Sequence, residues 1–229
     1  MAQFFLSASD SDALTRLSVL SGSASLAIVT HLGETAIEVS AFTAKSFIEL
    51  TEIGDVADSE VLLQISAPAS AENGSIPSGG AGARGNSTGD AYTSQTFSNS
   101  VSVLIIFRQD GTRSNLAFEW AGFAPGQNAI FHNRKLITSG SDIKGKIWPI
   151  GDPEPSTFNL ESTNAELTSG RVGISCGRSL DTFYVSAIGV GTNGDPAPTG
   201  PVATGPATPI NLGVSNLQAT SARLTWEQG

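Results

Sequence analysis

The stretch from Ile143 to Gly191, IKGKIWPIGDPEPSTFNLESTNAELTSGRVGISCGRSLDTFYVSAIGVG, decides the fold class of this chain. Residues 172–177, VGISCG, alternate between apolar and small side chains, and this period of two is typical of a strand with one covered face. After a short loop, residues 182–190, TFYVSAIGV, form a second segment rich in β-branched and aromatic residues. The stretch therefore predicts two successive strands of an all-β protein.

The chain before this stretch also consists of short apolar segments separated by turns. The segments that predict strands are 3–8, 15–20, 25–32, 35–42, 46–53, 58–66, 101–107, 116–123 and 128–137. Asp110-Gly111 is a typical hairpin turn between two of them. In 58–66 the alternation places Val61, Leu63 and Ile65 inward. No helical period of 3.6 persists, so we expect few helices.

Several motifs of the deciding stretch resemble the C-terminal half of a laminin-G-like (concanavalin-A-like) jelly roll. They are Trp148, Gly151, Glu154-Pro155, the run SGRVGI over 169–174 and the Asp-x-Phe at 181–183, preceded by residues 58–62, Ala83-Arg84 and Tyr92. The resemblance covers roughly residues 55–192 and concerns fold rather than activity. It implies a jelly-roll β-sandwich whose first strand pairs with its last. Domains with this spacing occur in bacteriophage virion proteins and carbohydrate-associated modules.

The C-terminal part of the chain has a different character. Five of the eleven prolines lie between residues 196 and 209, which predicts an extended, semi-rigid linker over 193–209 after a jelly-roll domain over 1–192. Residues 210–229 alternate again and resemble the first strands of a fibronectin type III domain, through Pro209, Leu212, Leu217, Ser221 and Trp226. Such a domain needs about 90 residues to close a sandwich, so we expect it to be incomplete here.

Charge and composition exclude several classes of function. The 229 residues carry a net charge of −9, and so acidic a surface repels nucleic acids and anionic membranes. No segment approaches the roughly 18 apolar residues of a membrane helix. The N-terminus has no basic region, which predicts a protein without a secretory signal, made in the cytoplasm. The single cysteine, Cys176, excludes an internal disulfide and a cysteine zinc site, and its apolar strand predicts a buried, inert thiol.

Two motifs are candidate sites for a metal ion or a nucleotide. Asp55, Asp58 and Glu60 offer the oxygen ligands that Ca²⁺ prefers, although the sequence lacks a calcium-loop signature. Residues 80–85, GAGARG, match G-x-G-x-x-G, but no helical period follows, which favours a mobile loop over a nucleotide site. We therefore expect no cofactor, with calcium at the acidic cluster as the alternative.

No catalytic constellation is recognisable. Glycosidases need two carboxylates that flank one bond, and the acidic run Glu-x-Asp-x-x-Glu or Glu-x-Asp-x-Glu of the glucanases that share the jelly roll is absent. The two histidines, His31 and His132, predict surface or half-buried polar roles. The sequence therefore predicts a protein that is not an enzyme.

Aromatic side chains are the candidates for glycan binding, because the C–H face of a sugar stacks on a ring. We consider Tyr92, Trp120 and Phe123, and we expect Tyr92 to be exposed beside a glycine-rich loop. Trp148 matches the core tryptophan of the resembled family, so we expect it to be structural. The expected binding loops are 67–90 and 121–128.

These features together predict a non-enzymatic virion protein, and the resemblance implies a bacteriophage component, such as a tail, fibre or baseplate protein that displays β-modules. Its expected partners are other virion proteins, further copies of the chain as a homo-oligomer and a host glycan, but neither nucleic acid nor membrane. Its expected location is the virion, after synthesis in the host cytoplasm. The first alternative is a carbohydrate-binding module that recognises cell-surface glycan, and the second is a capsid decoration protein.

Overall fold

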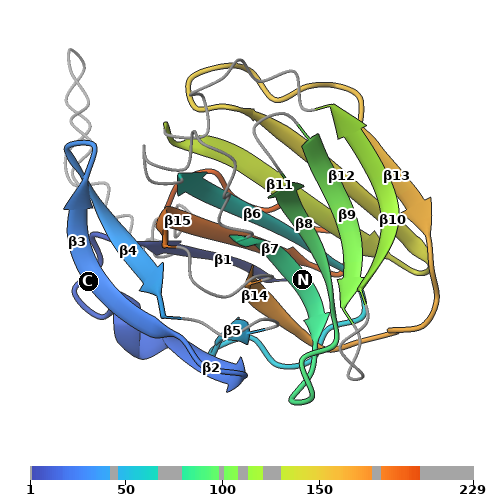
Figure 1. The fold of residues 1–229 in the computed structure, drawn as a ribbon, viewed down its shortest axis with the longest axis horizontal. Helices are drawn as coiled ribbons and strands as arrows, with labels where there is room; N and C mark the ends of the chain where they lie inside the picture. The colour runs from blue at the N-terminus through green and yellow to red at the C-terminus, as the bar shows by residue number, and fades with distance from the viewer. Residues whose placement is uncertain are drawn as a thin grey trace, which may run out of the picture.

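The computed structural model describes residues 2–41, 46–66, 79–97, 101–107, 113–120, 130–176 and 182–201, which form two antiparallel sheets (Figure 1). Sheet A contains β1 (Ala2–Ser7), β3 (Ser25–His31), β4 (Glu34–Ser40), β6 (Ser59–Ser66), β11 (His132–Ser139), β12 (Asp142–Pro149), β13 (Leu160–Thr163) and β15 (Phe183–Thr192). Sheet B contains β2 (Leu17–Ser21), β5 (Ser46–Leu50), β7 (Gly79–Gly85), β8 (Ala91–Phe97), β9 (Val101–Phe107), β10 (Arg113–Trp120) and β14 (Arg171–Cys176).

The order of the strands is that of a sandwich with long crossovers. Sheet A runs β13-β12-β11-β6-β15-β4-β3 with β1 paired to β15, and sheet B runs β10-β9-β8-β7-β14-β5-β2. The all-β prediction is confirmed, and so is the pairing of the first described strand with the last, with Ala2 opposite Thr192. The fibronectin-like prediction for 210–229 lies outside the described residues. No helix in the described part of the chain is long and apolar enough to span a membrane.

The core lies between the two sheets. Val61, Leu63 and Ile65 of β6 face it as predicted, and Ile174 and Cys176 of β14 meet them from sheet B. The prediction that Cys176 is buried is confirmed, and its complete burial raises the pKa of the thiol well above its ordinary value, which disfavours the reactive thiolate. The alternation of apolar residues was sufficient to predict this part of the core because each strand exposes one face to it.

The glycine-rich residues 79–85 form β7, a fully buried strand between β8 and β14. The predicted mobile loop is therefore wrong for 79–85, while 67–78 lie outside the described residues. A Cβ atom at Gly82 or Gly85 would come within 2.6 or 2.5 Å of the Phe47 ring. Glycine is required there because the aromatic ring packs directly on the strand backbone.

Arg84 interrupts the regular geometry of β7. Its φ of 53° is left-handed, at a point where the register between β7 and β14 shifts. The buried guanidinium donates hydrogen bonds to the carbonyl oxygens of Ala57, Leu167 and Gly140, at 2.8, 2.6 and 2.7 Å. One side chain thus holds three connecting segments at the same end of the sandwich.

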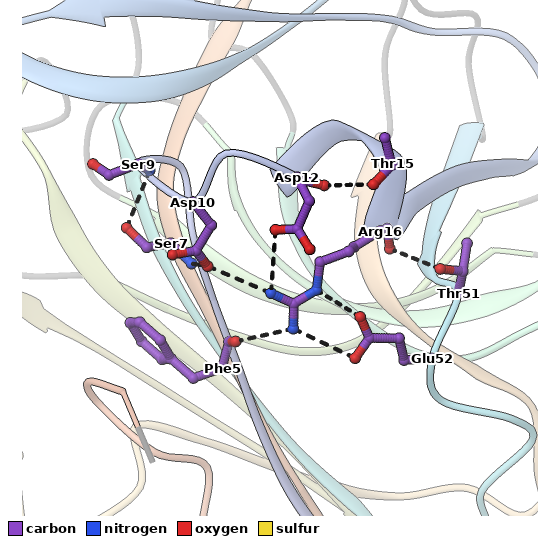
Figure 2. A network of polar contacts seen from close by, with 9 residues as sticks. All are labelled: Phe5, Ser7, Ser9, Asp10, Asp12, Thr15, Arg16, Thr51 and Glu52. Atoms are coloured by element: carbon purple, nitrogen blue, oxygen red, sulfur yellow. Dashed lines mark hydrogen bonds and ion pairs between the residues drawn. The ribbon is translucent and has the colours of Figure 1, made fainter. Parts of the chain in front are cut away.

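A second arginine holds the N-terminal segment. Arg16 ends the short 3-10 helix η1 (Ala13–Arg16), and Figure 2 shows its guanidinium between Asp10, Asp12 and Glu52. The closest ion pair joins its Nε to Oε1 of Glu52 at 2.6 Å, and another nitrogen donates to the carbonyl of Phe5. These contacts join β1, η1 and the segment after β5.

The interior also contains a buried polar pair, His132 and Arg134. Nε2 of His132 lies 3.2 Å from a guanidinium nitrogen of Arg134, and Nδ1 lies 3.3 Å from the carbonyl oxygen of Ile130. A neutral imidazole that donates from Nδ1 and accepts at Nε2 satisfies both contacts. The half-buried or surface role predicted for His132 is therefore wrong, since the residue is buried.

We expect His132 to make folding pH-dependent. Burial, reinforced by the charge of Arg134, lowers the pKa of His132 to about 3. Because the unfolded chain binds this proton near pH 6.5, stability is fully present above that pH and is lost as the pH falls towards 3. The loss amounts to about 1.4 kcal/mol per pH unit. Denaturant unfolding measures the free energy of unfolding at each pH from 7 to 4. Over this range the free energy of unfolding should fall less steeply for His132→Gln than for the natural chain. Equal falls in the two proteins would show that His132 is not the group that causes the pH dependence.

Candidate functional site

The outer face of sheet B carries buried polar groups that lack a partner. Thr93 and Gln95 alternate in β8 with the core residue Tyr92, so they face away from the core. Both side chains are completely buried, and Oγ1 of Thr93 and both amide atoms of Gln95 have no hydrogen-bond partner. Most buried polar groups in proteins are paired, so three such atoms on one strand face indicate a place for a ligand or water.

The neighbouring strand contributes only its backbone beside these groups. In the register of β7 and β8, Gly80 lies opposite Gln95 and Gly82 lies opposite Thr93. Neither glycine contributes a side chain that could hydrogen-bond the amide or the hydroxyl. Phe47 and Glu49 of β5 and Ser175 of β14 also lie on this face. The arrangement combines two donors and acceptors with an aromatic ring, as glycan sites do.

Of the three aromatic candidates for glycan binding, the structure describes the side chain of Tyr92. The prediction that Tyr92 is exposed is wrong: its ring is buried in the core, and its hydroxyl donates to Oδ1 of Asn164 at 2.6 Å and accepts from the backbone amide of Leu167. Tyr92 therefore anchors the segment around 164–167. Trp120 belongs to β10, and its backbone pairs with Val101 of β9. The side chain of Trp120 and all of Phe123 lie outside the described part of the chain.

The acidic residues do not form the predicted calcium cluster. Asp55 pairs with Arg171 at 3.0 Å, Asp58 lies 3.7 Å from Arg84, and Glu60 pairs with a lysine. Each carboxylate thus has a separate cationic partner. Among the described residues no three histidine, cysteine or acidic side chains could hold a metal ion together. The three residues are close in the sequence, but each carboxylate is engaged by a different cationic side chain.

Lys135, the ion-pair partner of Glu60, belongs to a charged group on the outer face of sheet A. Nζ of Lys135 lies 2.6 Å from Glu60 and 2.7 Å from Glu154, and Nζ of Lys146 lies 2.9 Å from Glu154. Burial by itself raises the pKa of Glu154, but the hydrogen bonds from both lysines outweigh it and lower the pKa overall. Every charge in this group is compensated, so we regard the group as structural.

An aromatic group on sheet A was not predicted. The rings of His31 and Tyr184 stack with centroids 3.7 Å apart, and Phe131 meets His31 edge-on at 5.7 Å. Nε2 of His31 also lies 3.2 Å from the hydroxyl of Ser66. Both stacked rings are half-buried, as predicted for His31. These contacts join the β3–β4 hairpin to the rest of sheet A. Because Tyr184 is an aromatic residue on sheet A, its substitution serves as a control for substitutions on the outer face of sheet B.

The signal for the sheet B site was present in the sequence only in part. The alternation in AYTSQTF indicates that Tyr92 faces one side and that Thr93 and Gln95 face the other. The sequence does not show that glycines lie opposite them, because that depends on the register of β7. An interpretation of 79–85 as a strand would have brought these residues together.

Comparison with known proteins supports the fold. No family model matches the chain, and no curated protein matches it significantly. The carbohydrate-binding module CBM66 from Bacillus subtilis matches with 14% identity, over 74% of this chain and 91% of that chain, with a TM-score of 0.53. A Bacillus subtilis protein of unknown function with a galectin-like fold matches with 10% identity, over 82% and 94% of the two chains, with a TM-score of 0.54.

Lectin-like and enzymatic proteins are also among the matches. The exoplasmic/lumenal domain of VIP36, in a form bound to Ca²⁺ and Man3GlcNAc, matches with 12% identity, over 82% of this chain and 86% of that chain, with a TM-score of 0.54. The Crh5 transglycosylase in complex with NAG matches with a TM-score of 0.50. The chain is therefore a concanavalin-A/galectin-like β-sandwich, a fold that carbohydrate-binding modules, lectin-like domains and enzymes share.

Proposed function

We propose that this protein is a non-catalytic carbohydrate-binding module that binds glycan on the outer face of sheet B. The observation that carries the proposal is the set of three buried, unpartnered polar atoms on Thr93 and Gln95. Sugar hydroxyls both donate and accept hydrogen bonds, so a single sugar unit can satisfy an amide and a hydroxyl together.

The structural matches favour this proposal over the virion role expected from the sequence. They include a carbohydrate-binding module and a glycan-bound domain. Neither of these two is a virion protein, so we rank glycan binding first. Assembly into a virion and a homo-oligomeric state belong to the lower-ranked proposal.

The proposal of a non-catalytic role rests on the composition of the site. Glycoside hydrolysis requires two carboxylates about 5–9.5 Å apart around the scissile bond. Among the side chains that the structure describes in the strands of sheet B, one is a carboxylate, Glu49, which lies 3.4 Å from Arg171. A single carboxylate that is paired with an arginine does not supply this acid and base pair.

Affinity electrophoresis through gels that contain mannan, β-glucan, xylan or levan tests the proposal. We expect at least one polysaccharide to retard the natural chain, and we expect no new reducing ends after prolonged incubation with that polysaccharide. Migration unaffected by every polysaccharide would overturn glycan binding. Release of reducing ends would overturn the non-catalytic role.

A further inference from the structure

The chain reverses its direction directly after β15. Asn193 and Gly194 have φ values of 57° and 90°, both left-handed, and the amide of Asp195 donates to the carbonyl of Thr192 at 3.2 Å. Asn-Gly is the residue pair that favours such tight turns. The segment that follows therefore returns to the domain, so residues 195–198 contact the sandwich and do not act as the predicted spacer.

The returning segment lies on the outer face of sheet A. A Cβ atom at Gly189 would collide with the carbonyl oxygen of Pro198, and one at Gly191 would collide with that of Asp195. These two glycines of β15 therefore allow the backbone of the segment to contact the sheet. On the same face, Ala197 is buried against Leu62 and Trp148.

Two hydrogen bonds fix the position of the segment along the sheet. The amide of Ala197 donates to Oε1 of Glu60 at 3.1 Å, and Nε2 of Gln3 donates to the carbonyl oxygen of Pro196 at 2.8 Å. Because Pro196 and Pro198 have no amide hydrogen, Ala197 supplies the only backbone donor of 196–198, and that donor is satisfied. The fit includes apolar contact, close backbone approach and hydrogen bonding.

We propose that the outer face of sheet A is a docking site for an extended proline-containing segment and that its occupant is the chain's own residues 195–198. Docking fixes the place at which the chain leaves the sandwich. The described chain therefore reaches Pro198 on the outer side of sheet A, opposite the outer face of sheet B. This inference does not depend on glycan binding.

Hydrogen exchange of the full chain tests the docking. Gly189→Val places a branched side chain where the carbonyl of Pro198 lies, whereas Gly200→Ala is a matched control because nothing lies within 4 Å of its new Cβ. We expect the Ala197 amide of the natural chain to exchange at least about 10-fold more slowly than an open amide. The control should retain this protection, and Gly189→Val should lose it while β6 remains protected.

A second pair of variants covers the case in which Gly189→Val fails to fold. Glu60→Ala removes the acceptor of the Ala197 amide, whereas Glu60→Gln keeps an acceptor oxygen. We expect faster exchange at Ala197 in Glu60→Ala and near-natural exchange in Glu60→Gln. An Ala197 amide that exchanges like an open amide in the natural chain, or that is equally protected in Glu60→Ala, would overturn the proposal.

Discussion

Replacing Arg84 by alanine is expected to lower the free energy of unfolding by roughly 3–5 kcal/mol, the largest loss for any single substitution considered. The guanidinium is 1% exposed and serves three carbonyl oxygens, those of Ala57, Leu167 and Gly140. Each carbonyl left without a partner costs about 1–3 kcal/mol. A domain of this size has a total stability of about 5–15 kcal/mol, so the variant would be close to unfolding.

The loss is measured by denaturant unfolding beside two comparison variants. Arg84→Lys keeps the charge but cannot serve three carbonyls in a fork geometry, so we expect an intermediate loss. It also provides a measurable value if Arg84→Ala does not fold. Arg16→Ala removes an arginine whose partners are exposed carboxylates, and we expect a loss of only about 1 kcal/mol. Equal losses for Arg84→Ala and Arg16→Ala would show that the three buried hydrogen bonds contribute little.

Substitutions at Thr93 and Gln95 are expected to separate stability from binding. Thr93→Val and Gln95→Met replace unpartnered buried polar groups by apolar groups of similar size. Because an unpaired buried group costs about 1–3 kcal/mol, each variant should be as stable as the natural chain or more stable. Each should bind the best polysaccharide at least about 10-fold more weakly, which corresponds to about 1.4 kcal/mol.

Unchanged or higher stability together with weaker polysaccharide binding would distinguish a binding role of Thr93 and Gln95 from a purely structural role. If Thr93 and Gln95 were satisfied within the fold, their replacement would lower stability and leave affinity unchanged. Tyr184→Ala removes an aromatic ring from the outer face of sheet A, and we expect it to leave affinity for the polysaccharide unchanged. A loss of affinity in Tyr184→Ala alone would move the binding site to sheet A.

The sequence was most informative where one face of a strand meets the core. Val61, Leu63 and Ile65 were placed correctly because alternation follows directly from the geometry of a strand. The same rule failed for 79–85, since glycine carries no side chain from which an inner face could be predicted. The reason for those glycines is the Phe47 ring, which comes from a strand distant in the sequence.

The outer faces were harder to predict because they depend on tertiary contacts. Leu62 alternates with the core residues Val61 and Leu63 and so points away from the core, yet it is buried against Trp148 and Ala197, and Ala197 belongs to the returning segment. The Asn193-Gly194 pair was the available signal for that return. The unpartnered state of Gln95 could not be predicted, because it requires the register between β7 and β8 and complete burial.

The most direct test of glycan binding on sheet B is a nitrogen–proton correlation spectrum of the natural chain, titrated with an oligosaccharide of the polysaccharide that retards it. We predict that the side-chain amide of Gln95 and the backbone amides of β8 shift most, while those of His31 and Tyr184 remain in place. Saturable shifts centred on His31 and Tyr184, with β8 unchanged, would contradict the site proposed here.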